Sequence, residues 1–268
     1  RILTVNEKQR YMRTLLVTGA AGFIGTNFVH YWRKTYPQDA IVVLDALTYA
    51  GNKANLSAVW NQQGFDFIHG SICDGPLVEK LLRQHNVNTL VHFAAESHVD
   101  RSIAGPDAFI DTNIVGTHTL LKAAKKMWLD DISVSDHHFH HVSTDEVYGN
   151  LATDDPAFLE TTAFAPNSPY AASKAASDHL VRSYHHTYGL NVTTSNCSNN
   201  YGPFHFPEKL IPLCLLNIFR GNPLPIYGDG KQTRDFVYAE DVAEAIFSAA
   251  VSGAEGTLNV GTGRPIDV

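Results

Sequence analysis

The 268-residue chain has few cysteines and no long apolar segment. Its three cysteines, Cys73, Cys197 and Cys214, lie far apart without the spacing of a metal site, so we expect buried free thiols in a reducing compartment. The longest apolar runs fall short of the roughly 20 residues that a membrane-spanning helix needs. The first residues lack the apolar core of a secretory signal. These absences predict a cytoplasmic globular protein that does not span a membrane.

The chain also has little positive charge. Lys and Arg number 20 against 27 Asp and Glu, which gives a formal net charge of −7. A negative chain is not drawn to nucleic acid or anionic lipid by charge alone, so we expect no nucleic-acid partner. Hydrophobic residues make up 44% of the sequence, which is ample for a core.

Short β-rich runs alternate with helical patterns through the first 200 residues. Strands are expected in TLLVTGAAG, AIVVLDAL, FDFIHGSI, VNTLVHFAAE, HHFHHVST and NVTTSNCS, with helices between most of them. Such alternation is typical of βαβ units, whose right-handed crossovers build a doubly wound parallel sheet covered by helices. We therefore predict an α/β fold of the Rossmann type with its main domain over residues 12–200.

The composition changes near Tyr201. Residues 201–236 are rich in Pro and Gly, with one expected helix between Pro207 and Arg220. We predict a smaller C-terminal substrate-binding lobe over residues 201–268. We expect this lobe to be incomplete, with some segments returning to the main domain.

A glycine pattern joins the first strand to the first helix. Gly19, Gly22 and Gly25 allow a tight turn that can approach a pyrophosphate beside the free N–H groups of a helix N-terminus. Asp45, at the end of the second strand, can accept hydrogen bonds from the adenosine ribose and would repel a 2′-phosphate. This combination favours NAD over NADP and makes residues 12–200 the NAD-binding domain. The alternative is a tight strand–helix turn with an Asp cap.

Tyr170 and Lys174 form a Y-x-x-x-K pair on an expected helix, where residues four apart share a face. An ammonium near a phenol favours phenolate, so Lys174 should lower the pKa of Tyr170 from about 10. Such a tyrosine can take the proton of an alcohol while hydride leaves for nicotinamide. The alternative is an amphipathic Tyr beside a solvated Lys.

Two neighbouring acids, Asp145 and Glu146, follow Thr144 in STDEVYG at the end of the fifth expected strand. Adjacent carboxyls repel and tend to hold one proton between them, which leaves one acid and one base. The alternative is a solvated acid pair, or a helix N-cap followed by acids.

These motifs together resemble the extended short-chain dehydrogenase/reductase superfamily, which acts on nucleotide sugars. HFAAESHVDRSI, DTNIVGT, STDEVYG, SPYAASKAASDHLV and CSNNYGPFHFPEKLIP resemble its dTDP-glucose 4,6-dehydratase family in particular. The resemblance implies a homodimeric hydro-lyase with tightly bound NAD and dTDP-glucose as substrate. Such an enzyme oxidises C4, removes water across C5 and C6, and returns the hydride to C6. The product, dTDP-4-keto-6-deoxyglucose, serves deoxysugar biosynthesis of the rhamnose type.

The resemblance also implies a role for each central residue. Asp145 is the acid of the elimination and Glu146 is its base. Thr144 bonds the C4 oxygen, Tyr170 removes the proton from that oxygen, and Lys174 holds the nicotinamide ribose and tunes Tyr170. Oxidation to a C4 ketone acidifies the C5 proton, which explains why the redox step precedes elimination.

Further contacts are implied by the same resemblance. Cofactor contacts are expected at Gly19, Gly22, Phe23, Ile24, Gly25, Asp45, Thr48, Ser71, Ile72, Ala94, Ala95, Ser97, Thr112, Tyr170, Lys174 and Asn200. Substrate contacts are expected at Glu96, Thr144, Asn199, Lys209, Leu210 and Arg234. The residues alone also allow packing at the alanines, turn chemistry at the asparagines, a solvated charge at Lys209 and an ion pair of Arg234 with Asp235.

Some positions depart from the family pattern. Ser71 stands where the family usually has an Asp that bonds adenine, so Asp74 is an alternative partner for the base. RDFVYAEDV replaces the more usual RDWLYVEDH, which leaves the nucleotide base open, and the family continues beyond residue 268. Residues 1–11 precede Met12 and are expected to lie ahead of the first strand. The alternative functions are another nucleotide-sugar epimerase or decarboxylase, and a catalytically silent NAD-binding protein.

Four histidines cluster in DHHFHH, at His137, His138, His140 and His141. Alternate residues of a strand face the same side, so some of them can share a face. No Cys or acid of fixed spacing joins them, and we therefore expect no metal site.

Overall fold

The computed structural model describes residues 12–134, 136–152, 155–226, 230, 232–252 and 254–267. Within these ranges, seven strands form one parallel sheet in the order β10-β6-β5-β4-β1-β2-β3. The strands are β1 (Thr14–Thr18), β2 (Ala40–Asp45), β3 (Phe65–His69), β4 (Thr89–His92), β5 (His138–Thr144), β6 (Val192–Cys197) and β10 (Gly256–Val260). The doubly wound α/β fold predicted from the sequence is confirmed.

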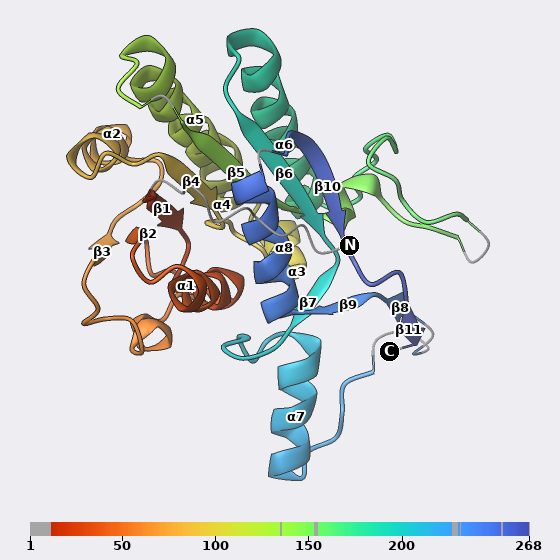
Figure 1. Ribbon diagram of the computed structural model, residues 1–268. Coiled ribbons are helices and arrows are strands. Elements are labelled where there is room, and N and C mark those ends of the chain that lie inside the picture. Colours follow the sequence, from red (N-terminus) through yellow and green to blue (C-terminus); the bar gives the residue numbers. More distant parts are fainter. Residues whose placement is uncertain are drawn as a thin grey trace.

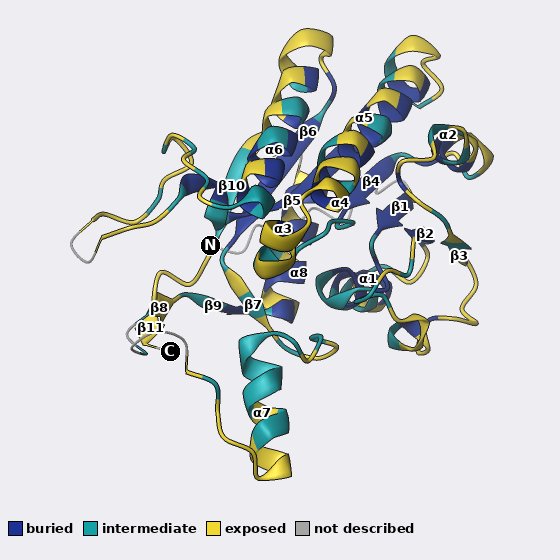
Figure 2. Ribbon diagram, turned by 180° about the vertical axis from the view of Figure 1, so that it is seen from behind, coloured by how far each residue is buried: buried dark blue, intermediate teal, exposed yellow. Residues whose placement is uncertain are grey.

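Helices cover both faces of this sheet, which is why most strands are buried along nearly their whole length (Figure 2). One face is covered by α1 (Phe23–Thr35) and α8 (Ala239–Ser252), and the other by α2 (Gly75–Gln84), α5 (Thr117–Lys125) and α6 (Pro169–Tyr188) (Figure 1). Phe28, Trp32 and Ile246 belong to the core on the first side. Leu82 and Trp128 belong to the core on the second side. Each helix therefore buries one apolar stripe against the sheet.

The long helix predicted over DTNIVGTHTLLKAAKKMW contains two π-helical segments. Its successive parts are α4 (Asp107–Phe109), η2 (Ile110–Gly116), α5 and η3 (Lys126–Asp130). Thr112 and the buried Asn113 lie in the first π segment. Extra residues of this kind shift the direction of side chains, and they often occur at functional sites.

The residues after Tyr201 contribute both to the main α/β layers and to a helix that projects from them. α8 and β10 pack with the main layers, whereas α7 (Leu210–Arg220) projects from the body and buries none of its residues. Two small sheets lie between them, formed by β7 (Asn199–Tyr201) with β9 (Phe236–Tyr238) and by β8 (Thr233–Arg234) with β11 (Ile266–Asp267). The division at residue 200 into a cofactor domain and a substrate lobe stays a prediction.

Three short elements complete the described chain, namely η1 (Lys53–Leu56), α3 (Val99–Ala104) and η4 (Asp145–Tyr148). Among the helices of the described ranges, none combines the length and the apolar character needed to cross a membrane. The expectation of three buried thiols is wrong, because only Cys197 is buried while Cys214 is half-buried. Cys73 is exposed, since it lies in the surface turn ahead of α2. Residues 1–11 and Val268 lie outside the described residues.

Candidate active site

A cavity of about 480 Å³ opens at the carboxyl ends of the strands, where the strand order reverses between β1 and β4. This switch point is where open α/β sheets bind their ligands. Of the predicted site residues, all of which the structure describes, Asp145 alone does not line the cavity. Residues more than 200 positions apart in the sequence, from Gly19 to Arg234, thus meet around one space.

The glycine turn leaves room for a ligand beside the start of α1. Gly19 has a φ of +71°, and a Cβ there would lie 2.5 Å from the amide nitrogen of Ala94. A Cβ on Gly25 would lie 2.7 Å from the carbonyl oxygen of Gly19. α1 begins without a side-chain cap and without an acid in its first turn, so its N–H groups are available to an anion. The turn therefore fits the pyrophosphate of a dinucleotide.

Asp45 ties this turn to the end of β2. Its two carboxylate oxygens accept hydrogen bonds of 2.8 Å from the backbone amides of Ala21 and Leu47. Burial raises the pKa of Asp45, and these two hydrogen bonds act against that rise. The carboxylate does form the structural link that the alternative interpretation proposed. It also lines the cavity beside Thr48, where a ribose could meet it.

At the position of the family's adenine-binding Asp, the cavity is lined by Ser71. The Ser71 hydroxyl oxygen accepts a hydrogen bond of 3.1 Å from the backbone amide of Cys73. Asp74 instead caps α2, where its carboxylate accepts from the Leu77 amide at 3.0 Å. Asp74 is not among the residues that line the cavity. The alternative of a shifted loop that offers Asp74 to the base is therefore not favoured.

The Y-x-x-x-K pair lies at the cavity wall with Lys174 turned to the sheet. Lys174 Nζ donates to the carbonyl oxygen of Val142 at 2.8 Å. Burial raises the pKa of Tyr170, and the negative charge of Glu146 raises it further, while a hydrogen bond with Thr144 lowers it. Burial also lowers the pKa of Lys174 to about 8. That Lys174 lowers the pKa of Tyr170 stays a prediction, and any such effect must act against burial and the carboxylates.

The two adjacent acids begin a short helical turn after β5. Thr144 caps η4 by accepting a hydrogen bond of 3.3 Å from the backbone amide of Glu146, so the N-cap interpretation also holds. Glu146 is among the residues that line the cavity, whereas Asp145 is not. Asp145 Oδ1 instead accepts from the Thr144 hydroxyl at 3.5 Å, so the two carboxyl groups have different surroundings.

The surroundings of the two acids separate their proton affinities. Burial, then Glu146, then Asp235 raise the pKa of Asp145 to about 6. Burial also raises the pKa of Glu146, but Lys209 and Arg234 act against that rise. At Asp145 the effects of Glu146 and Asp235 exceed the opposite effect of Arg234, whereas the charges that act on Glu146 are cations, so Asp145 is the group that holds a proton more readily.

Asn113 was not anticipated from the sequence. Its side chain accepts from the Glu96 amide at 2.9 Å and donates to the Glu96 carbonyl at 3.0 Å and to Ser173 Oγ at 2.8 Å. These bonds fix the loop after β4 against α6. A buried Asn inside a helical pattern carries no sequence signal for such a role.

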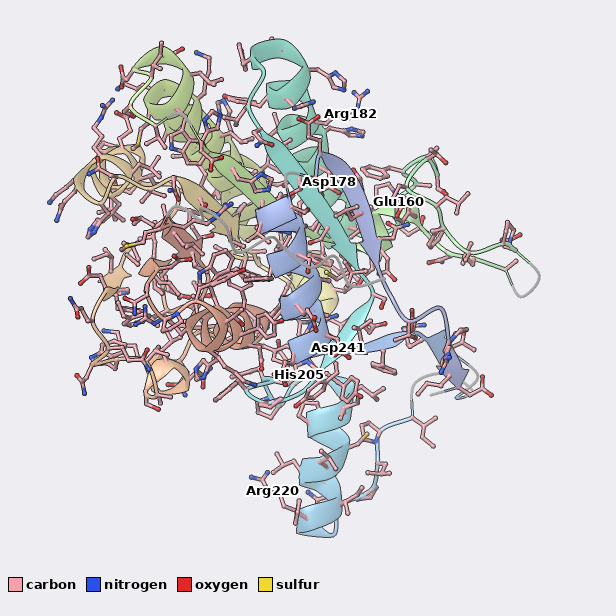
Figure 3. The ribbon with its side chains drawn as sticks, in the orientation of Figure 1. Glu160, Asp178, Arg182, His205, Arg220 and Asp241 are labelled. Carbon is pink, nitrogen blue, oxygen red and sulfur yellow. The ribbon has the colours of Figure 1, made fainter. Side chains whose placement is uncertain are left out.

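A second unexpected group closes the other side of the cavity. His205, labelled in Figure 3 near the start of α7, stacks on Phe23 with ring centroids 4.2 Å apart. Lys209 Nζ donates to the carbonyl oxygen of Ser97 at 3.2 Å. The segment around residues 203–209 is thereby held over the glycine turn and the loop after β4.

Three of the four clustered histidines, His138, His140 and His141, contact polar groups of neighbouring elements, whereas the ring nitrogens of the fourth, His137, have no hydrogen-bond partner among the described residues. His138 Nε2 and His140 Nδ1 lie 2.8 Å and 2.6 Å from Thr193 Oγ1, so these alternate residues share a face as predicted. His141 Nε2 lies 3.2 Å from a carboxylate oxygen of Asp178. A hydroxyl of β6 thus contacts His138 and His140, and a carboxylate of α6 contacts His141.

Comparison with known proteins gives the same picture. Residues 16–268 match the family described as GDP-mannose 4,6 dehydratase. The chain is 53% identical to dTDP-glucose 4,6-dehydratase 1 of Escherichia coli K12, over 92% of this chain and 71% of that protein. It is 56% identical to the dTDP-glucose 4,6-dehydratase of Xanthomonas campestris pv. campestris strain B100, over 93% of this chain and 71% of that protein. A crystal structure of the Streptomyces venezuelae dTDP-glucose 4,6-dehydratase DesIV with NAD bound matches with a TM-score of 0.87 at 47% identity, over 95% and 77% of the two chains.

Proposed function

This chain belongs to the GDP-mannose 4,6 dehydratase family, and we propose that within it the chain is an NAD-dependent dTDP-glucose 4,6-dehydratase. The observation that carries this proposal is the placement of Thr144, Glu146, Tyr170 and Lys174 around one cavity, with Asp145 between two of them in the chain. A simple dehydrogenase has no use for two acids beside the Tyr–Lys pair, whereas elimination of water needs one acid and one base. The curated relatives at 53% and 56% identity carry the same activity in their names.

The first step is oxidation at C4 of the glucose unit. The glycine turn, Asp45 and Thr48 would hold NAD, and bound NAD would supply the hydride acceptor and later the hydride donor. Thr144 positions the C4 hydroxyl, and Tyr170 takes its proton as the hydride leaves. The carboxylates nearby raise the pKa of Tyr170, so this proton transfer depends on positive charge close to Tyr170. Lys174, one helical turn away, supplies it.

The second step is loss of water across C5 and C6. The C4 ketone acidifies the C5 proton, which Glu146 removes as the general base. Asp145 protonates the departing C6 hydroxyl. Their surroundings suit these roles, because Glu146 and Asp235 outweigh Arg234 at Asp145, while Lys209 and Arg234 both favour the charged form of Glu146. The single proton of the pair is therefore on the residue that must give it away.

The nucleotide diphosphate would lie toward the segments after β6. Lys209 and Arg234 line this side of the cavity and carry positive charge, and Asn199 and Leu210 lie beside them. Burial lowers the pKa of Lys209, and Glu208 and Glu146 act against that decrease. Its ammonium already bonds the Ser97 carbonyl, so a diphosphate would find it oriented. Glu96 would contact the sugar.

We also place this activity in the cytoplasm and expect a homodimer. Ile103, Ile110 and Val115 are exposed near the outer faces of α5 and α6, and a second copy could cover them in a four-helix bundle. Light scattering or sedimentation tests the dimer directly. A particle with the 29.5 kDa mass of one chain would overturn it.

The test of the activity is to incubate the protein separately with dTDP-glucose and UDP-glucose and to weigh the products. Loss of one water from the dTDP sugar alone, abolished by Asp145→Asn with Glu146→Gln, is the expected result. Loss from both sugars would mean a relaxed base preference. A product of unchanged mass with an inverted C4, or loss of carbon dioxide from a uronate, would replace the proposal by another activity.

A further inference from the structure

Behind the cavity, three ionisable side chains lie in a buried row. Lys174 Nζ is 3.5 Å from His141 Nε2, and the same nitrogen is 3.2 Å from Asp178 Oδ1. His141 is fully buried and Asp178 is 5% exposed. Lys174 and Asp178 are four residues apart on α6, so they share the face that packs on β5. Figure 3 labels Asp178 where α6 and β6 overlap in the view.

One nitrogen of His141 lies between the two charged groups. It cannot both accept from Lys174 and donate to Asp178, and Asp178 Oδ1 lies 3.2 Å from it without a hydrogen bond. Lys174 Nζ donates to the Val142 carbonyl at 2.8 Å, and Ser143 Oγ donates to Asp178 Oδ2 at 2.9 Å. Burial raises the pKa of Asp178 to about 7, and Lys174 and the Ser143 hydrogen bond act against that rise. Asp178 and Lys174 therefore interact through charge across the edge of one imidazole.

The groups that face Lys174 from the neighbouring elements offer little other compensation. They are His92 on β4, His141 on β5, Cys197 on β6, and Tyr170 and Asp178 on α6 itself. Burial and the charge of Lys174 hold the pKa values of His92 and His141 well below the ordinary range, and burial raises the pKa of Cys197 to about 12. These three groups are therefore neutral near pH 7. Asp145 and Glu146 act on Tyr170 instead.

We propose that Asp178 is a positioning residue for the reaction, whose charge across the edge of His141 keeps Lys174 protonated and its ammonium on the Val142 carbonyl at the cavity wall. A buried ammonium without a countercharge loses its proton. Asp178 opposes that loss, since its charge raises the pKa of Lys174 while burial lowers it. The use of Lys174 in catalysis rests on the proposed function, but the coupling of Asp178 to Lys174 does not.

The coupling can be measured without any activity. The protein is grown with lysine labelled with ¹³C at Cε, and the Lys174 signal is assigned by its absence in Lys174→Arg. We expect Lys174 to titrate near 8 in the parent protein, and about one pH unit lower or more in Asp178→Asn. Asp130→Asn, which removes one exposed surface charge, is the matched control and should leave the Lys174 signal in place. An unchanged Lys174 titration in Asp178→Asn overturns the proposal.

A milder variant covers the case in which Asp178→Asn does not fold. Ser143→Ala removes one donor from the carboxylate and keeps its charge, so it should shift the Lys174 titration in the same direction by a smaller amount. No shift, or a shift upward, counts against the proposal.

The same variants separate the inference from the proposed function. C4 oxidation, followed by the absorbance of the reduced cofactor, should fall as pH rises through the Lys174 titration, and this limb should move down with the NMR signal in Asp178→Asn. An equal loss at every pH would mean a merely structural role and would overturn the inference. A parent protein that shows the NMR coupling but removes no water would instead refute the function.

Discussion

The backbone amide of Glu146 donates a hydrogen bond of 3.3 Å to the side-chain oxygen of Thr144. The hydroxyl that we assign to the C4 oxygen of the sugar therefore also starts the turn that carries Asp145 and presents Glu146 to the cavity. The turn that Thr144 caps thus sets both the group that orients the C4 oxygen and the base for elimination across C5 and C6. The division of labour between the two acids follows from this turn and can be tested residue by residue.

Asp145→Asn should stop water loss but not removal of the C5 proton. The amide cannot protonate the departing hydroxyl, so we expect dehydration to slow by about 10² to 10⁴-fold. Glu146 remains in place, so C5 should still exchange with deuterium when the reaction runs in D₂O. Glu146→Gln should abolish both the exchange and the water loss. Mass spectrometry of the recovered sugar nucleotide measures both quantities.

Asp130→Asn serves as the control for these two variants, because it removes an exposed acid that pairs with Lys125. It should dehydrate at the parent rate. Deuterium at C5 in Glu146→Gln, together with none in Asp145→Asn, would reverse the assigned roles.

The elimination step should slow above about pH 6. Asp145 must be protonated to act as an acid, and burial with the neighbouring acids raises its pKa to about 6. Its protonated fraction then falls about tenfold per pH unit above that value. Asp235→Asn removes one of the acids that raise this pKa. The descending limb of the pH–rate profile, where the elimination rate falls, should therefore move to lower pH.

Single-turnover rates of water loss between pH 5 and 9 check this dependence. Asp267→Asn, an exposed acid on β11, is the control and should leave the limb where it is. A limb that stays in place in Asp235→Asn, or that moves to higher pH, contradicts the assignment of Asp145 as the acid.

Gly19→Ala should remove the cofactor. A Cβ at this position would lie 2.5 Å from the backbone nitrogen of Ala94, so the loop that lines the cavity must shift. Overpacking of this kind costs about 1–3 kcal/mol, and we expect NAD affinity to fall by about 100-fold, which corresponds to about 2.7 kcal/mol. Nucleotide released on denaturation, and titration with NAD, measure the loss.

Gly189→Ala is a close control, because Gly189 has a φ of +74° and nothing within 4 Å of a Cβ. It carries the same backbone strain without a clash, so it should lose some stability and keep its NAD. Equal NAD content in the two variants would show that the contact of Gly19 with Ala94 does not shape the site.

The parts of the site that could be predicted are those set by local sequence. A strand, a glycine turn and a helix follow one another at the first βα junction, and Asp45 closes the next strand. The spacing therefore places these residues together in any doubly wound sheet. Tyr170 and Lys174 share a face for the same local reason.

The parts that could not be predicted depend on contacts between distant segments. The four-residue spacing places Lys174 near Tyr170, but it does not show that the ammonium bonds the Val142 carbonyl or that Glu146 dominates the field at the phenol. Likewise, His205 reaches Phe23 only because the segment after β7 folds back over α1. The direction of the pKa shift at Tyr170 and the contact of His205 with Phe23 both depend on how the distant segments are buried together. The spacing of residues along the sequence does not reveal this burial.

The buried histidines should make the fold sensitive to acid. Burial lowers the pKa of His138 to about 4, and it lowers those of His92, His140 and His141 well below the ordinary value. Between about pH 6.5 and pH 4 the unfolded chain takes up a proton at His138 that the folded chain does not, so stability falls by up to about 1.4 kcal/mol per pH unit from this residue. The contribution is fully present above the unfolded pKa and is lost as the pH decreases.

Urea unfolding at pH 7.5, 6.5, 5.5 and 4.5 measures this loss. His138→Gln removes the titrating group while its amide can still bond Thr193, so the variant should lose about 2 kcal/mol less than the parent between pH 6.5 and 4.5. His186→Gln, at an exposed position of α6, should follow the parent curve. If His138→Gln lost stability with the parent slope, the acid sensitivity would have to come from groups other than this imidazole.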